Sequence, residues 1–199
     1  MQIFWSDFVL TFVPLFIVVD AIGNLPIVLT LSEGMSGHER NRMIHVAMAT
    51  ATAVGLVFLF FGQFILNIMK IETGALAIAG GIILFTLSIR YLISGRTIEA
   101  QREEMIAVVP IGTPLVVGPA TITTLLLFSK QYPIYTVLVS LMLNLLISWA
   151  IFLVGNHIAR FLGKGGLKAI SQIFNLLIAA IAVNMVFHGL ELLNIIKPT

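Results

Sequence analysis

Six long apolar stretches occupy most of the chain, and they restrict its fold more than any other feature. They cover about residues 5–31, 43–69, 73–94, 106–129, 134–162 and 166–195. As a helix rising about 1.5 Å per residue, each is long enough to cross the roughly 30 Å of hydrocarbon in a bilayer. The stretches are continuous rather than alternating, which favours helices over the strands of a barrel. The sequence therefore predicts an all-α polytopic membrane protein with six transmembrane helices.

Composition agrees with a bilayer as the solvent of the whole chain. Hydrophobic residues make up 59% of the sequence and charged residues 10%, against about 25% charged in soluble domains. We therefore expect residues 1–199 to form a single transmembrane domain whose partner is membrane lipid. The chain has no cysteine, and its four histidines lack metal-ligand spacing, so no metal or other cofactor is expected. A net charge of +2 is too small to indicate a nucleic-acid partner.

The positions of lysine and arginine predict the orientation in the membrane. The connections after the second and fourth stretches, together with the C-terminal end, hold only Lys70, Lys130 and Lys197. The connections after the first, third and fifth stretches hold the other eight: Arg40, Arg42, Arg90, Arg96, Arg102, Arg160, Lys164 and Lys168. Basic residues stay preferentially in the cytoplasm. The bias predicts a multi-pass protein of the cytoplasmic (inner) membrane with both termini outside.

Three landmarks recur at almost one offset and indicate an internal repeat. Gly23-Asn24 precedes Gly118-Pro119 by 95 positions, Gly62-Gln63 precedes Gly155-Asn156 by 93, and the stretch from Gly81 precedes that from Asn175 by 94. Each copy, about 1–95 and about 105–199, contains three predicted helices. Because three is odd, the second copy must enter the membrane from the other side. The sequence thus predicts two inverted three-helix repeats, an arrangement found in transporters.

Glycine and proline cluster in the middle of the first and fourth stretches and predict that both helices are broken. The first cluster runs from Asp20 to Pro26 and the second from Pro110 to Pro119. Glycine disfavours a helix by about 1 kcal/mol and proline by about 3 kcal/mol. Pro26 and Pro119 suit the first turn of a new half-helix, with Asn24 or Gly118 near the cap position. The exposed N–H groups at such a start attract carboxylates. The alternative is a pair of proline kinks that only shape helix packing.

Polar residues near the breaks form the candidate site. Asp20 is the only acidic residue well inside a stretch, and an intramembrane charge costs about 2.5–3.5 kcal/mol by insertion scales. We assign it to coupling with a cation or proton, or to a substrate amine; capping of the broken helix is an alternative that can coexist. The candidate substrate-binding residues are Gly23, Asn24, Pro26, Gly118, Pro119, Thr121 and Thr123.

Two further asparagines and a glycine-rich face have weaker assignments. Asn175 and Asn184 are candidates for an aqueous pathway, although such side chains also serve as hydrogen-bonded contacts between helices. Gly74, Gly80 and Gly81, with intervening alanines, give the third stretch a face of small residues. We expect this face to allow close helix packing rather than to bind a ligand.

The two breaks carry a family resemblance. Asp20-x-x-Gly23-Asn24-x-Pro26, followed by Pro114-x-x-x-Gly118-Pro119-x-Thr121-Ile122, resembles the MarC family, which includes the small neutral amino acid transporters called SnatA. The resemblance extends over essentially the whole chain. It implies a secondary transporter of glycine, alanine or similar amino acids, driven by a Na⁺ or H⁺ gradient. One departure is Ala21, where relatives often have proline after the aspartate.

A secondary transporter accounts for the repeat, the paired breaks and Asp20 together. A channel, or an exporter of another small metabolite, would use the same architecture. An intramembrane enzyme is a weaker alternative, because the chain has no His-Glu-x-x-His, no Gly-x-Ser-x-Gly and no paired intramembrane aspartates. We therefore expect no enzymatic activity. The substrate, the coupling ion, the direction of transport and formation of a homo-oligomer stay open at this point.

Overall fold

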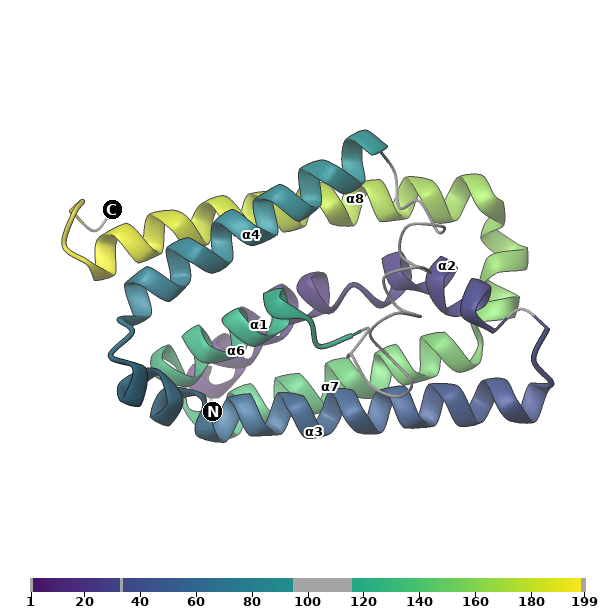
Figure 1. Cartoon of the computed structure of the whole chain (residues 1–199), viewed down its shortest axis with the longest axis horizontal. Helices are drawn as coiled ribbons and strands as arrows, with labels where there is room; N and C mark the ends of the chain where they lie inside the picture. The colour runs from purple at the N-terminus through teal and green to yellow at the C-terminus, as the bar shows by residue number, and fades with distance from the viewer. Residues whose placement is uncertain (1, 33, 95–115, 198–199) are drawn as a thin grey trace.

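The fold was obtained as a computed structural model, which describes residues 2–32, 34–94 and 116–197. Within these residues there are seven α-helices and no strand. The helices are α1 Gln2–Val19, α2 Ala21–Leu31, α3 Gly37–Met69, α4 Thr73–Ser94, α6 Pro119–Gln131, α7 Ile134–Leu153 and α8 Gly155–Leu192. They form an elongated bundle in which the long helices run side by side (Figure 1).

Five of the predicted spans correspond to helices long and apolar enough to cross a membrane. These are Trp5–Leu31, Gly37–Met69, Thr73–Ile93, Ile134–Leu153 and Gly165–Leu192. Large apolar side chains point outward from them, and Phe64 and Ile68 of α3 are more than 60% exposed. Such an outer surface is stable against lipid and unstable in water. Of the predicted fourth span, 106–129, only α6 and the three residues before it lie among the described residues, so the six-span inverted repeat stays a prediction.

Two predicted helix boundaries are wrong. In both cases the residue at which the helix begins or ends is set by the local backbone rather than by hydropathy. Helix α3 begins at Gly37 rather than near residue 43, because Ser36 and Glu39 form a capping box. The predicted fifth span, 134–162, ends early: α7 stops at Leu153 and α8 begins at Gly155. Gly163 then bends α8, with a left-handed φ of 64°. The apolar stretch continues past Val154, so composition gave no sign of the boundary between α7 and α8.

The helix connections gather at the two ends of the bundle (Figure 1). The α2–α3 and α7–α8 connections lie at one end, and the α3–α4 and α6–α7 connections lie at the other. Arg40 follows the first of these connections, whereas Lys70 and Lys130 flank the connections at the opposite end. Arg40 is thus separated from Lys70 and Lys130 by the length of the bundle.

Single cysteines at the two ends test the predicted orientation. The natural chain has no cysteine, so each introduced thiol reports on one position. We expect an impermeant thiol reagent added outside intact cells to label Glu72→Cys and Gln131→Cys, and to label Met35→Cys and Gly165→Cys only after the membrane is opened. Labelling of Met35→Cys in intact cells, with Gln131→Cys protected, would reverse the assigned orientation.

The small-residue face of α4 allows close packing, as predicted, and its partner is α8. A Cβ added at Gly81 would lie 2.6 Å from the carbonyl oxygen of Ala182. A Cβ at Gly189 would lie 2.6 Å from the carbonyl oxygen of Gly74. The two helices therefore touch through backbone atoms at two places along their length. In a membrane, close backbone packing of this kind replaces the hydrophobic effect as the force that holds helices together.

Gly189→Val is expected to destabilise the bundle strongly. The new side chain would meet backbone of α4, which cannot move aside as a side chain can, so the cost should be about 3 kcal/mol or more. Thermal unfolding of the detergent-purified protein measures the loss. Gly165→Val is the matched control, because it is the same change in the same helix and a Cβ there meets no described atom within 4 Å. Equal unfolding temperatures for the two variants would contradict the close α4–α8 contact.

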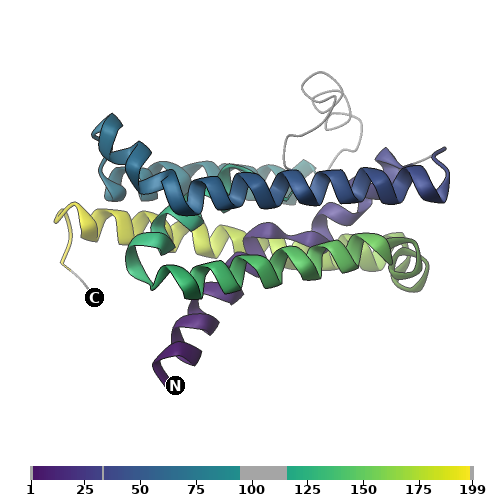
Figure 2. The same ribbon diagram turned by 90° about the horizontal axis from the view of Figure 1, so that it is seen from below.

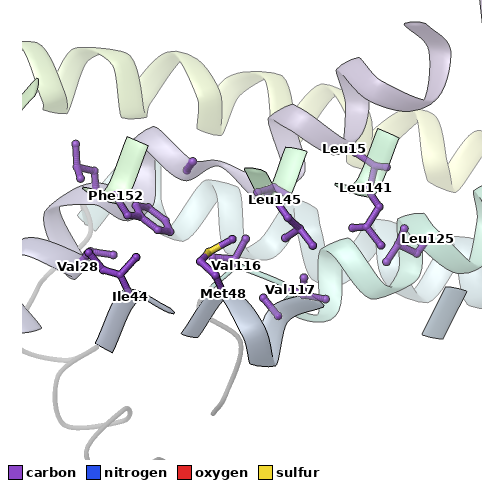
Figure 3. Packing of buried hydrophobic residues seen from close by; sticks show 14 of the residues in the cluster. Leu15, Val28, Ile44, Met48, Val116, Val117, Leu125, Leu141, Leu145 and Phe152 are labelled. Atoms are coloured by element: carbon purple, nitrogen blue, oxygen red, sulfur yellow. The ribbon is translucent and has the colours of Figure 1, made fainter. Parts of the chain in front are cut away.

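The core lies between α1, α2, α3, α6 and α7, and it includes the first predicted break and the two valines before the start of α6. Val19 and Ala21, on either side of the first break, belong to the same buried cluster as Val116 and Val117, just before the second. Figure 3 shows Val116 and Val117 beside Met48 of α3 in the middle of this cluster. Sequence segments almost 100 residues apart thus meet in the interior. In the view from below, α1 enters this region obliquely from one face of the bundle (Figure 2).

Candidate functional site

The first break consists of a single residue, Asp20. Its backbone is left-handed, with φ 46° and ψ 53°, and it separates α1 from α2. The Asp20 N–H still donates to the Phe16 carbonyl at 3.2 Å, and the Asp20 carbonyl accepts from the Asn24 N–H at 2.9 Å. One left-handed residue changes the helix direction while keeping these hydrogen bonds. The side chain is 2% exposed, so a carboxyl group lies in the interior of the bundle.

Asp20 caps α2, one of the two roles that the sequence left open. Its Oδ1 accepts the Gly23 N–H at 3.0 Å, which satisfies one of the unpaired donors at the start of a helix. Gly23 makes room for this bond, because a Cβ there would lie 2.6 Å from the Asp20 Cγ. The Asp-x-x-Gly spacing of the motif is therefore explained by the cap itself.

The predicted cap and first turn of α2 are wrong. Asp20, not Asn24, is the cap residue, and Pro26 is the sixth residue of α2 rather than part of its first turn. Asn24 instead spans the break, because its Nδ2 donates to the Val19 carbonyl at 3.1 Å. Pro26 has no N–H to donate to the Ile22 carbonyl one turn earlier, so it weakens the helix locally without ending it. Propensity located the break correctly to within one turn but could not identify the left-handed residue.

The start of α6 agrees with prediction. Gly118 is the cap residue, Pro119 is the first residue of the helix, and the Ile122 N–H donates to the Gly118 carbonyl at 3.0 Å. No side chain of the described residues caps this helix. A Cβ at Gly118 would meet no described atom within 4 Å. The rest of the second cluster, including Pro110 and Pro114, lies outside the described residues.

The hydroxyl groups of Thr121 and Thr124 donate to backbone carbonyls four or five residues earlier in the chain. Thr121 is 1% exposed, and its hydroxyl donates to the Val116 carbonyl at 3.2 Å, which fixes the chain just before the helix. The Thr124 hydroxyl donates to the Ala120 carbonyl at 2.9 Å. Thr123 packs against Gly80 of α4, where an added Cβ would lie 2.9 Å from its Oγ1. Thr121 and Thr123 thus position the start of α6.

The two candidate pathway asparagines occupy different environments. Asn175 is 2% exposed, and its Oδ1 has no hydrogen-bond partner among the described residues. The neighbouring Phe174 ring lies 6.0 Å from the ring of Phe16, so this turn of α8 passes beside the end of α1. Asn184 lies at an exposed position of α8. The structure therefore brings Asn175, and not Asn184, close to the first break.

A buried polar stripe on α7 was missed by the sequence reasoning. Thr136, Ser140, Asn144 and Ser148 recur every four residues and are at most 1% exposed. The Ser140 hydroxyl forms a 2.7 Å hydrogen bond with Thr11, and Asn144 donates to the Phe12 carbonyl at 3.2 Å. The four-residue spacing was the available signal, because it places all four side chains on one helix face. These bonds join α7 to α1 just before the break.

The two half-helices leave the centre of the bundle in opposite directions. Helix α2 extends toward the end with the α2–α3 connection, and α6 extends toward the other end (Figure 1). The positive ends of both helix dipoles therefore lie in the interior. At one of them is the buried carboxyl group of Asp20, and at the other is the start of α6, which no side chain of the described residues caps. Among the described residues, no group of three His, Cys, Asp or Glu side chains could hold a metal ion.

These features define a polytopic α-helical membrane protein with helix starts in its interior. The profile described as MarC family integral membrane protein matches residues 5–193. The chain therefore belongs to the MarC family.

Relatives match over nearly their full length. The inner membrane protein YhgN of Escherichia coli K12, described as UPF0056, is 31% identical over 89% of this chain and 93% of its own. The UPF0056 membrane protein MJ0972 of Methanocaldococcus jannaschii is 33% identical over 90% of this chain and 84% of its own. These descriptions name a membrane location and no substrate. No solved structure matches the chain.

Proposed function

We propose that this protein is a secondary transporter of small neutral amino acids such as glycine and alanine, coupled to Na⁺ or H⁺. The observation that carries the proposal is the pair of half-helix starts in the bundle interior, one beside a buried aspartate and the other without a side-chain cap among the described residues. Together they offer opposite electrostatic environments at membrane depth. A zwitterion needs both: a group that accepts from its ammonium and donors for its carboxylate.

The two starts have different roles in this proposal. The Asp20 carboxylate already occupies the positive end of α2, so a second anion there would be repelled. Asp20 therefore takes the substrate ammonium or the coupling cation. Among the described residues, no side chain caps the start of α6 and no atom lies within 4 Å of a Cβ at Gly118, which suits the substrate carboxylate. Asn24 and Thr121 add neutral hydrogen-bonding groups without another charge to desolvate, and the narrow interior favours glycine- or alanine-sized side chains.

The packing of helices supports the inverted repeat on which alternating access depends. In the inverted repeat, α1–α2 corresponds to α6, α3 to α7 and α4 to α8. The contact of α3 with α6 then corresponds to the contact of α7 with α1, and both contacts are present. The contact of α4 with α6 likewise becomes that of α8 with α2. Repeats related in this way can rock about a fixed central site.

Leucines of the two half-helices pack on two of the landmark glycines, although Gly155 lies at the start of α8 rather than in α7. Leu126 of α6 packs on Gly62 of α3, and Leu25 of α2 packs on Gly155 at the start of α8. Gly62 and Gly155 are the landmark glycines found at equivalent positions in the sequence. A leucine of each half-helix therefore packs on a landmark glycine of the other repeat.

Uptake into proteoliposomes tests the proposal. With an imposed Na⁺ or H⁺ gradient, we expect saturable, concentrative uptake of labelled glycine or alanine that stops when that gradient is dissipated. Competition by the other unlabelled amino acids defines the size limit of the site. Flux that neither saturates nor concentrates would indicate a channel. No flux of any of the twenty amino acids under either gradient would overturn the assignment.

A further inference from the structure

A polar cavity lies at the end of the bundle where α3 connects to α4. Its volume is about 400 Å³, and its charged lining residues are Lys70, Glu72 and Lys130. Leu66 and Leu192 supply apolar walls. The volume falls within the range of small-molecule sites in proteins, about 300–1,000 Å³. The cavity is separate from the two interior helix starts and has no part in the transport site described above.

The charges that line this cavity are not neutralised by one another. Among the residues that the structure describes, neither lysine forms an ion pair, and neither does Glu72. The Lys130 ammonium donates to the Thr73 hydroxyl at 2.9 Å, and Thr73 is only 8% exposed. This bond holds the ammonium group at the cavity wall. Two ammonium groups and one carboxylate leave an excess of one positive charge.

The placement of the two lysines is unexpected for this end of the bundle. Only three of the eleven lysine and arginine residues lie on this side of the chain, yet Lys70 and Lys130 line the same cavity. They come from different elements, the end of α3 and the last turn of α6. A side chain that only snorkels to the membrane surface needs no such convergence.

We infer that this cavity binds a small oxyanion through Lys70 and Lys130. The ligand chemistry is a carboxylate or phosphate group carrying one net negative charge, held by charge-assisted hydrogen bonds from the two ammonium groups. Such a group is available from two sources at a membrane surface: a phospholipid headgroup and a free solute. The apolar walls suit the glycerol and first acyl carbons of a lipid, whereas a free anion would need only the lysines.

The double variant Lys70→Gln/Lys130→Gln tests the site, with Lys197→Gln as the matched control at the same end of the bundle. Native mass spectrometry of delipidated protein measures retention of phosphatidylglycerol against phosphatidylcholine. Equilibrium dialysis measures binding of inorganic phosphate. We expect at least about a tenfold loss of binding in the double variant, recovery in Lys70→Arg/Lys130→Arg, and no change in Lys197→Gln. Thermal unfolding checks that each variant is folded.

The probes distinguish the two sources. Preference for phosphatidylglycerol alone identifies a lipid site, and binding of phosphate lost in the double variant identifies a free-solute site. Equal loss in Lys197→Gln would reduce the effect to general surface charge and overturn the inference. So would the absence of binding of every probe to the wild-type protein. Because uptake by the interior site is measured separately, failure here leaves the proposed transport function unaffected.

Discussion

Asp20→Asn is expected to leave the fold intact and to abolish concentrative uptake. Asparagine caps helices as well as aspartate and tolerates the left-handed backbone that this position requires. Its side-chain oxygen can accept the Gly23 N–H that Asp20 now accepts at 3.0 Å. Only the charge is lost, at a cost to the helix dipole of less than about 1 kcal/mol.

The functional loss should be much larger than the structural one. A charge-assisted hydrogen bond to an ammonium or cation contributes about 1.5–3 kcal/mol, so its removal weakens binding by about tenfold or more. Without a titratable or cation-binding group, coupling to the gradient should fail altogether. Labelled-substrate accumulation in proteoliposomes and thermal unfolding in detergent give the two readouts.

Asp20→Ala separates the cap from the charge. It removes both and should lower the free energy of unfolding by about 1 kcal/mol, whereas Asp20→Asn should not. If Asp20→Asn protein accumulates substrate as the wild type does, Asp20 serves only to cap α2. Loss of uptake in Asp20→Asn with unchanged unfolding is the result that assigns it to coupling or to substrate binding.

The sequence predicted the elements that depend on composition and missed those that depend on local bonding. Hydropathy located the long helices because lipid selects apolar residues over a fixed length, as in Thr73–Ser94. Glycine and proline located the first break and the start of α6, while the rest of the second cluster lies outside the described residues. The residue at which each helix restarts is set by hydrogen bonds, and here the two breaks differ. Pro119 occupies the first position of α6 as predicted, whereas the Asp20 cap starts α2 six positions before Pro26.

The sequence also could not predict whether each candidate residue is buried or exposed, or which atoms lie beside it. Asn175 and Asn184 are both asparagines of α8, yet one is buried and the other exposed, since nine positions on a helix turn the side chain to the opposite face. Gly62 and Gly118 likewise look equivalent as glycines in apolar stretches. In the structure, Leu126 fills the space at Gly62, while no described atom lies within 4 Å of a Cβ at Gly118.

Gly118→Val is expected to retain the fold and to lose binding of glycine and alanine. The backbone at Gly118 is extended, with φ −84° and ψ −175°, a conformation that valine adopts readily. The substitution therefore tests space rather than backbone strain. Its methyl groups would enter the region beside the uncapped N–H groups of α6, where the proposed substrate carboxylate lies. Loss of two charge-assisted hydrogen bonds should weaken binding by about 100-fold.

Equilibrium binding of labelled alanine to purified protein measures this effect, and Gly118→Ala should give an intermediate loss. Gly62→Val is unsuitable as a control, because the added side chain would displace Leu126 and disturb the packing of α3 on α6. Gly165→Val is suitable, because an added Cβ there also meets no described atom within 4 Å and the position lies far from the helix starts. Unchanged alanine binding by a folded Gly118→Val protein would place the substrate carboxylate elsewhere than at the start of α6.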